Sequence, residues 1–170
     1  MELALRRILL LHGIILTVGG IPLLYLGDEV ATLNDYSYRD DPAHARDSRW
    51  VHRPRADWER YSQRSDPKTI PGQIYQRLQK LISLRKKVPA FGGGDLEVIQ
   101  TENEHVLGYI RARDDKRTLI FANFSENQQV ISAAVLEKYE PHSLKCLHGL
   151  GELSSEGELF LVPFDLLVLG

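Results

Sequence analysis

Cysteine is almost absent from this sequence of 170 residues, which contains only Cys146. A single cysteine excludes an internal disulfide framework, and it also excludes a metal cluster held by several thiolates. An excess of charge of one sign is missing as well, because 21 basic residues face 23 acidic ones and the formal net charge is −2. This balance gives no electrostatic reason to expect nucleic acid or an anionic membrane as a partner. The composition therefore indicates a globular protein and leaves its function to the local sequence.

The longest apolar run lies at the N-terminus, and three interpretations of it are open. Two arginines, a short apolar stretch and paired glycines are typical of a signal peptide, and residues 8–26 are long enough to be considered as a membrane span. Polar and helix-breaking residues favour a third interpretation, with a buried helix over residues 3–16, a turn over 17–20 and a buried strand over Ile21–Leu26. Because the strand is apolar at nearly every position, we expect it to lie in a parallel sheet that is covered on both faces.

A long polar stretch follows, from Asn34 to Thr69, with Trp50 and Trp58 embedded in it. A loop of this length is unusual in a compact domain and is often functional. An amphipathic helix is predicted to begin at Pro71-Gly72, with apolar residues at helical spacing, namely Ile74, Leu78, Leu81, Ile82 and Leu84. Pro89 and the glycines 92–94 end this helix and mark the best domain boundary in the chain.

Beyond residue 94 the hydrophobic period changes from helical to twofold, which predicts strands. Turn signals separate seven candidates: Leu96–Gln100, Val106–Arg111, Thr118–Phe124, Gln129–Ala133, Leu144–Leu147, Glu158–Val162 and Leu166–Leu169. Several short strands in close succession indicate a small antiparallel β-sandwich. The single parallel strand at Ile21–Leu26 does not fit such a module. Either it pairs with a strand of the module, or the sequence is the tail of a larger α/β protein.

Several short motifs resemble the α-amylase family of glycoside hydrolases. The run Gly20-Ile-Pro-Leu-Leu-Tyr-Leu-Gly-Asp-Glu29 is similar to the eighth barrel strand of that family. The run Asp47-Ser-Arg-Trp-Val-His-Arg-Pro-Arg55 resembles the amylosucrase and sucrose hydrolase branch, as do Leu33–Asp35, Asp66-Pro67, Gly72–Gln76, Gly108–Arg111 and Asn123–Ser125. The similarity extends from about residue 7 to residue 170.

The resemblance implies a specific fold, in which the lone strand has partners. A (β/α)8 barrel needs about 250 residues, so residues 1–89 would hold only its end: strand eight, the long loop after it and helix eight. Residues 90–170 would form the C-terminal β-sandwich domain. The long loop would then lie at the C-terminal face of the barrel, where active sites lie. Met1 is accordingly expected to be an internal start or a fragment boundary.

The resemblance also implies where the chemistry resides. Retaining glycosidases need two carboxyl groups about 5 Å apart, and in this family these groups precede the region matched here. We therefore assign no catalytic residue within the chain and expect the isolated polypeptide to be inactive. Asp28 and Glu29 are expected to be structural, because neighbouring strand positions point to opposite faces. The resemblance assigns substrate binding to Arg49, whose guanidinium would pair with an aspartate near the start of the barrel and close the pocket around the glucosyl ring.

The predicted function is glucosyl transfer from sucrose to an α-1,4-glucan, with release of fructose and no cofactor, metal, nucleic acid or membrane. Sucrose hydrolysis, or another glycosidase activity of the family, is an alternative that shares the same visible residues. A second alternative is a non-enzymatic carbohydrate-binding β-module, which the placement of Tyr109, Phe121 and Phe124 within predicted strands disfavours. A third is an unrelated small membrane-anchored protein. Trp50 and Trp58 either stack on sugar rings or pack the loop.

Overall fold

The computed structural model describes all residues from 1 to 170 and folds into two compact units. Unit 1 consists of residues 1–23 and 80–170, and unit 2 consists of residues 24–79. No helix in either unit combines the length and the hydrophobicity that crossing a membrane requires.

Unit 1 begins with helix α1 (Glu2–Thr17), which confirms the helix predicted at the N-terminus. Leucine, a strong helix former, supplies six of its 16 residues. Its buried face includes Leu5, Leu10 and Leu16. Gly13 lies on the same face, where a Cβ atom would come within 2.4 Å of the Leu166 side chain. The absence of a side chain at residue 13 therefore lets the helix approach strand β8 closely.

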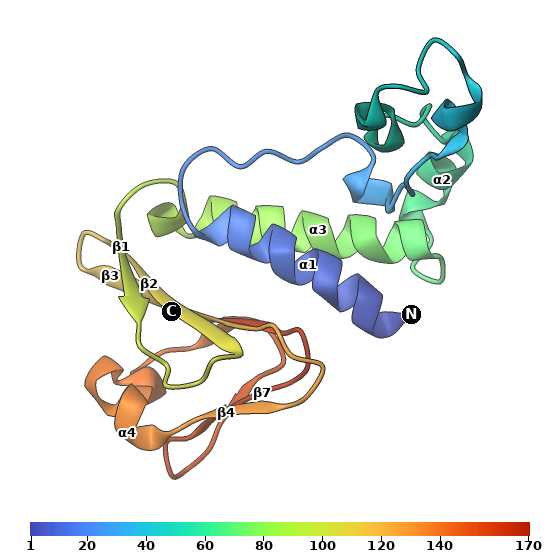
Figure 1. The fold of residues 1–170 in the computed structure, drawn as a ribbon. Helices are drawn as coiled ribbons and strands as arrows, with labels where there is room; N and C mark the ends of the chain where they lie inside the picture. The colour runs from blue at the N-terminus through green and yellow to red at the C-terminus, as the bar shows by residue number, and fades with distance from the viewer. The chain divides into compact units, whose positions relative to one another are not determined.

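Two antiparallel sheets make up the rest of unit 1 (Figure 1). The larger sheet has the order β1-β2-β3-β8-β5; its strands are β1 (Asp95–Ile99), β2 (Val106–Arg113), β3 (Lys116–Asn123), β8 (Leu166–Leu169) and β5 (Cys146–His148). The smaller sheet has the order β4-β7-β6; its strands are β4 (Gln129–Ile131), β7 (Leu159–Leu161) and β6 (Glu152–Leu153). The antiparallel strands predicted beyond residue 94 are thus confirmed, whereas β6 was not predicted.

Both sheets contribute to one hydrophobic core. Phe121 and Leu167 enter it from the larger sheet, and Ile131 and Leu161 enter it from the smaller one. A short helix, α4 (Ala133–Leu136), adds Leu136 to the same core. The predicted strand Gln129–Ala133 therefore stops early, because Ser132 is the N-cap of this helix. Three short 3-10 helices complete the unit: η5 (Pro89–Phe91), η6 (Glu137–Tyr139) and η7 (Pro141–Ser143).

The prediction of a buried strand at Ile21–Leu26 is wrong for this chain. These residues form no strand and pair with neither sheet. Ile21 is 99% exposed, Leu23 79% and Leu26 76%. Both sheets are antiparallel and are built from residues 95–169, so no parallel strand offers its backbone groups to this segment. Without a ladder partner an apolar run has no sheet in which to bury its side chains.

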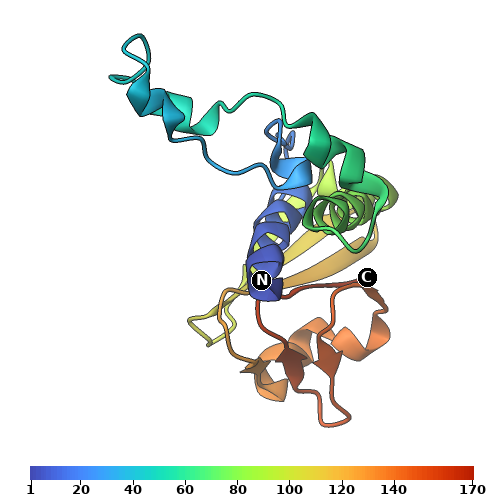
Figure 2. The same cartoon turned by 90° about the vertical axis from the view of Figure 1, so that its right-hand side faces the viewer.

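Unit 2 consists of short helical turns joined by irregular segments (Figure 2). They are η1 (Asp28–Val30), η2 (Ser37–Asp40), η3 (Ser48–His52), α2 (Trp58–Ser62) and η4 (Gln63–Ser65). Helix α3 (Ile70–Lys87) begins in this unit and confirms the predicted amphipathic helix. At its start a Cβ atom on Gly72 would lie 1.8 Å from the Asp66 carbonyl oxygen. Only glycine permits this close turn into the helix.

Two arginines hold the C-terminal end of α1 within unit 1. Arg111, on β2, is only 4% exposed, and its guanidinium donates to the carbonyl oxygens of Val18, Ala90 and Gly94 at 2.8–3.1 Å. Arg85 donates to the carbonyl oxygens of Leu16 and Gly20 at 2.6 Å. The last carbonyls of a helix lack intrahelical partners and carry partial negative charge. The two guanidinium groups satisfy carbonyls at and just beyond the end of α1, and they complement the helix dipole.

Replacement of Arg111 with alanine is expected to destabilise unit 1 by about 3 kcal/mol, because it leaves buried carbonyl groups unpaired and opens a cavity. Arg113→Ala is the matched control, since Arg113 lies two residues along the same strand with a side chain that is 52% exposed. The control should change the free energy of unfolding by less than about 0.5 kcal/mol. Equilibrium urea unfolding measures both. Equal midpoints for the two variants would show that the buried hydrogen bonds do not stabilise this junction.

Candidate functional site

Arg49, the residue assigned to substrate binding, lies in η3 on the surface of unit 2. Its side chain is 74% exposed and faces the Asp47 carboxylate. Arg49 Nε donates to Asp47 Oδ1 at 2.8 Å, and Arg49 Nη2 donates to Asp47 Oδ2 at 2.8 Å. Asp47 also caps η3, because its Oδ1 accepts the backbone N–H of Arg49 at 3.0 Å. The guanidinium is therefore oriented by a short local pair, while Nη1 makes no hydrogen bond within the chain.

The same contacts set the ionisation of Asp47. Hydrogen bonds from the Arg49 side chain, and then from its backbone N–H, lower the pKa of the Asp47 carboxyl to about 2. The carboxylate consequently stays ionised, and the pair stays intact, at all pH values above that range. Because the pair is exposed, its contribution is to the orientation of Arg49 and not to global stability.

Unit 2 contains a pocket of about 730 Å³. Its lining residues lie between positions 32 and 60, the same stretch of sequence that holds Asp47 and Arg49. Trp50, the residue after Arg49, lines the pocket, as do Tyr38 and His44. The rings of His44 and Trp50 have centroids 3.9 Å apart, and His44 Nδ1 lies 2.8 Å from an Asp41 carboxylate oxygen. Arg49 is not part of the lining. The structure therefore places the two neighbours Arg49 and Trp50 in different surroundings.

The second tryptophan of the loop lies outside the pocket. Trp58 is 76% exposed, and its ring lies 5.6 Å from that of Tyr61. It opens helix α2, which Asp57 caps by accepting the backbone N–H of Arg60. Trp50, in contrast, is half-buried. The two roles considered for these tryptophans, stacking on a sugar ring and packing the loop onto the barrel, stay predictions.

Glu29 has the hydrogen-bonding role expected of it. Its Oε2 accepts the backbone N–H of Gly27 at 2.7 Å, and its Oε1 accepts the hydroxyl of Tyr61 at 2.9 Å. Burial, followed by this contact with Glu29, raises the pKa of Tyr61. Both carboxylate oxygens are thus engaged, one within the local turn and one by Tyr61 of helix α2.

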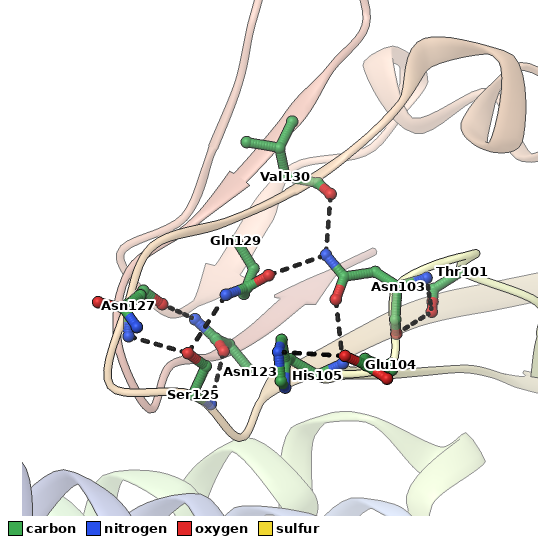
Figure 3. Close-up of polar contacts among 9 residues, drawn as sticks. All are labelled: Thr101, Asn103, Glu104, His105, Asn123, Ser125, Asn127, Gln129 and Val130. Atoms are coloured by element: carbon green, nitrogen blue, oxygen red, sulfur yellow. Dashed lines mark hydrogen bonds and ion pairs between the residues drawn. The ribbon is translucent and has the colours of Figure 1, made fainter.

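A polar cluster that the sequence did not predict lies in unit 1, between the ends of β3 and β4 (Figure 3). Asn123 is fully buried and donates to the carbonyl oxygens of Asn127, Leu161 and Val162 at 2.9–3.2 Å. Asn103 donates to the Gln129 side chain at 3.0 Å. Every buried polar side-chain atom in the chain has a partner, and the hydrogen bonds of this cluster join the loops that carry its residues. The motif Asn123-Phe124-Ser125 contributes to the family resemblance, but nothing in the local sequence predicts that the Asn123 side chain is buried.

Histidines and acidic residues form no metal-binding constellation. No group of three or more His, Cys, Asp or Glu side chains is arranged to hold a metal ion. His12 is bonded within its own helix, because its Nδ1 lies 2.8 Å from the Ile8 carbonyl oxygen. His52 Nδ1 lies 3.2 Å from Asn34 Oδ1.

Comparisons with known proteins relate the chain to carbohydrate-active enzymes. It is 29% identical over 158 residues to trehalose synthase of Thermus thermophilus, which covers 79% of this chain and 16% of that enzyme. It is 24% identical over 132 residues to α-amylase 3 of Dictyoglomus thermophilum, which covers 72% of this chain and 26% of that enzyme. No family model matches the sequence. The chain thus spans between a sixth and about a quarter of the length of these relatives.

The fold is similar to the C-terminal part of solved enzymes of the α-amylase family. Trehalulose synthase MutB from Pseudomonas mesoacidophila superimposes with a TM-score of 0.67 at 18% identity, over 96% of this chain and 38% of that one. MutB variants have been solved with glucose and with sucrose bound. The wider resemblance to the α-amylase family is therefore confirmed, while none of these relatives singles out the amylosucrase branch.

Removal of the Arg49 guanidinium is expected to raise the pKa of Asp47 from about 2 toward its ordinary value of 3.8. Arg49→Gln keeps the backbone hydrogen bond and deletes the charge-assisted one, so the midpoint should rise without reaching 3.8. Arg53→Gln is the matched control, because Arg53 is the weakest of the influences on Asp47. Carbon-detected NMR titration of the Asp47 carboxyl measures all three proteins. An unchanged midpoint in Arg49→Gln would contradict the pairing.

Proposed function

We propose that this chain is the C-terminal part of an amylosucrase-like enzyme of the α-amylase family. The enzyme would take the glucosyl unit of sucrose by retaining double displacement, pass it to the end of an α-1,4-glucan and release fructose. The observation that carries the proposal is the run Asp47–Arg55, which resembles the sucrose-acting branch and presents Arg49 with its donors exposed. The similarity to MutB, solved with sucrose, supports a sucrose-related substrate.

The proposed role of Arg49 is to close the pocket around the transferred glucosyl ring. A planar guanidinium binds one carboxylate in a fork and keeps further donors for a second acceptor. Asp47 already occupies Nε and Nη2, which orients the side chain and leaves Nη1 for that second acceptor. In the proposed enzyme this acceptor is a carboxylate or sugar hydroxyl supplied from outside these 170 residues.

The catalytic carboxylates are proposed to lie outside this chain as well. Double displacement needs a nucleophile and an acid/base group about 5 Å apart. Glu29, which follows the strand-like motif, has both oxygens engaged by Gly27 and Tyr61. Under this proposal residues 21–26 take the place of a barrel strand, the antiparallel sheets of residues 95–169 form the C-terminal β-sandwich, and the domain division falls near residue 89.

Sucrose hydrolysis, or another glycosidase activity of the family, fits the same residues equally well. Transfer and hydrolysis differ in the acceptor, and nothing in the Arg49 pair selects between glucan and water. A non-enzymatic carbohydrate-binding module fits less well, because Tyr109 and Phe121 are 2% and 0% exposed and Phe124 alone of the three is exposed.

The decisive test expresses the whole reading frame that contains these residues and supplies sucrose. Transfer predicts fructose in excess of free glucose, together with a growing α-1,4-glucan, whereas hydrolysis predicts equal amounts of fructose and glucose. The 170-residue chain alone should release no fructose. Absence of fructose from the complete protein would overturn the sucrose assignment.

Arg49→Lys in the complete protein is expected to lower kcat/KM for sucrose about 100-fold, because an ammonium group lacks the fork geometry that positions the ring. Arg46→Lys is the matched control, since Arg46 is exposed in the same loop and makes no hydrogen bond or ion pair. Initial-rate measurements of fructose release compare the two variants. Equal rates would remove Arg49 from the site.

A further inference from the structure

A second pocket lies entirely within unit 1, where helix α3 ends and the hairpin of β2 and β3 turns. Its volume is about 650 Å³, which is within the range of small-molecule sites. Apolar and basic side chains make up most of its lining. We propose that this pocket binds a small organic anion, whose carboxylate meets the basic side chains and whose apolar body lies on the apolar ones. The proposal concerns unit 1 alone and requires neither sucrose chemistry nor Arg49.

The apolar part of the lining is held in place within the unit. Val88, Ala90 and Leu144 are half-buried or buried, whereas Leu147 is 42% exposed. The carbonyl oxygen of Ala90 accepts two hydrogen bonds from the buried Arg111 guanidinium, at 2.8 and 3.0 Å. Leu144 packs against the hydrophobic core. Because these side chains are already ordered, covering them with a ligand costs little further conformational entropy.

Two like charges lie opposite each other at the hairpin end of the pocket. Arg113 and Lys116 are direct partners in the register of β2 and β3, and like charges at such positions repel. Lys116 makes no hydrogen bond or ion pair in the chain, and neither does Lys87, the lysine that α3 contributes to the lining. Arg113 has one long contact of 3.9 Å to the Asp114 carboxylate, which is 88% exposed and screened by water. An anion between the two strands would relieve this repulsion.

A hydroxyl group without a partner faces the same pocket. Thr118 lies two residues after Lys116, on the same face of β3, and it is only 4% exposed. Its Oγ1 makes no hydrogen bond within the chain, although every side-chain oxygen and nitrogen that is sealed from solvent has a partner. The hydroxyl is therefore open to the pocket that Thr118 lines. It can donate to a carboxylate oxygen and so gain the hydrogen bond that it lacks.

The charges of the lining favour a carboxylate over a phosphate. Four basic side chains line the pocket, but Arg117 is paired with Glu140 at 3.1 Å. The other three share the lining with Asp114, Asp115 and the carboxyl group of Gly170. A phosphate dianion would be repelled by these groups more strongly than a monoanion. A carboxylate also matches the planar fork of a guanidinium group.

Titration calorimetry of the 170-residue chain with 2-naphthoate tests the proposal, because this ligand carries one carboxylate on an apolar double ring. 2-Naphthylmethanol has the same rings without the charge and should bind about tenfold more weakly. Inorganic phosphate has the charge without the rings and should not displace 2-naphthoate. Equal affinity for the alcohol would overturn the part given to the basic side chains. Displacement by phosphate would overturn the part given to the apolar body.

Two neighbouring lysines at the end of α3 form a matched pair of variants. Both are exposed, but only Lys87 lines the pocket, whereas Lys86 does not. Lys87→Gln should weaken the binding of 2-naphthoate about tenfold, and Lys86→Gln should leave the dissociation constant unchanged. Equal dissociation constants for the two variants would contradict the site.

Thr118→Val keeps the shape of the side chain and removes its hydroxyl. Since that hydroxyl has no partner in the chain, the urea midpoint should not fall, while the affinity for 2-naphthoate should fall about fivefold. Amide chemical shifts of the isotope-labelled chain then locate the ligand. Shifts at residues 113–118 support the proposal, and shifts confined to the exposed apolar residues 21–26 would overturn it. Because no measurement uses catalysis, failure here leaves the sucrose reaction to be judged separately.

Discussion

A buried guanidinium with no carboxylate partner is the interaction on which the rest of unit 1 depends. Arg111 is 4% exposed and is compensated by three backbone carbonyls, one just after α1 and two in the stretch from η5 to the turn before β1. Burying a charge is costly unless hydrogen bonds replace its hydration. The three segments therefore stabilise one another through this one side chain. The hydroxyl contact between Thr17 and Tyr109 lies beside this junction, and burial raises the pKa of Tyr109 to about 12.

The geometry of that junction explains why the chain turns where it does. Gly19 has φ +115°, and a Cβ atom there would lie 3.0 Å from the Arg111 guanidinium. The glycine thus serves two purposes, since it reverses the chain after α1 and leaves room for Arg111, whose guanidinium donates to the Val18 carbonyl oxygen. The same guanidinium reaches the carbonyl of Gly94, where the chain enters β1. One side chain consequently sets the positions of both the helix end and the first strand.

The sequence alone was sufficient for those elements whose cause is local. Helices α1 and α3 and strands β2, β3 and β8 follow from the hydrophobic period and from turn and helix-ending signals, and they lie close to the predicted residues. Strand β6 has only two residues and α4 only four, so neither produces a readable period. The role of Arg111 was out of reach because its partners are backbone atoms of distant segments. In the candidate site, the sequence did not predict that Arg49 pairs with Asp47, two residues away. The contact between the His44 and Trp50 rings, which are tilted by 41°, depends on how residues 41–50 turn.

The error at Ile21–Leu26 has a different physical origin from these omissions. A run of apolar residues is most stable when its side chains are buried. In this segment Ile21, Leu23 and Leu26 are instead 76–99% exposed. Contiguous exposed apolar surface in a globular protein marks an interaction site or an unmet partner. The superposition with MutB uses 96% of this chain but only 38% of that enzyme. The proposed function accounts for both facts, since it supplies the missing neighbours of this segment and the acceptor for Arg49 from the same additional residues.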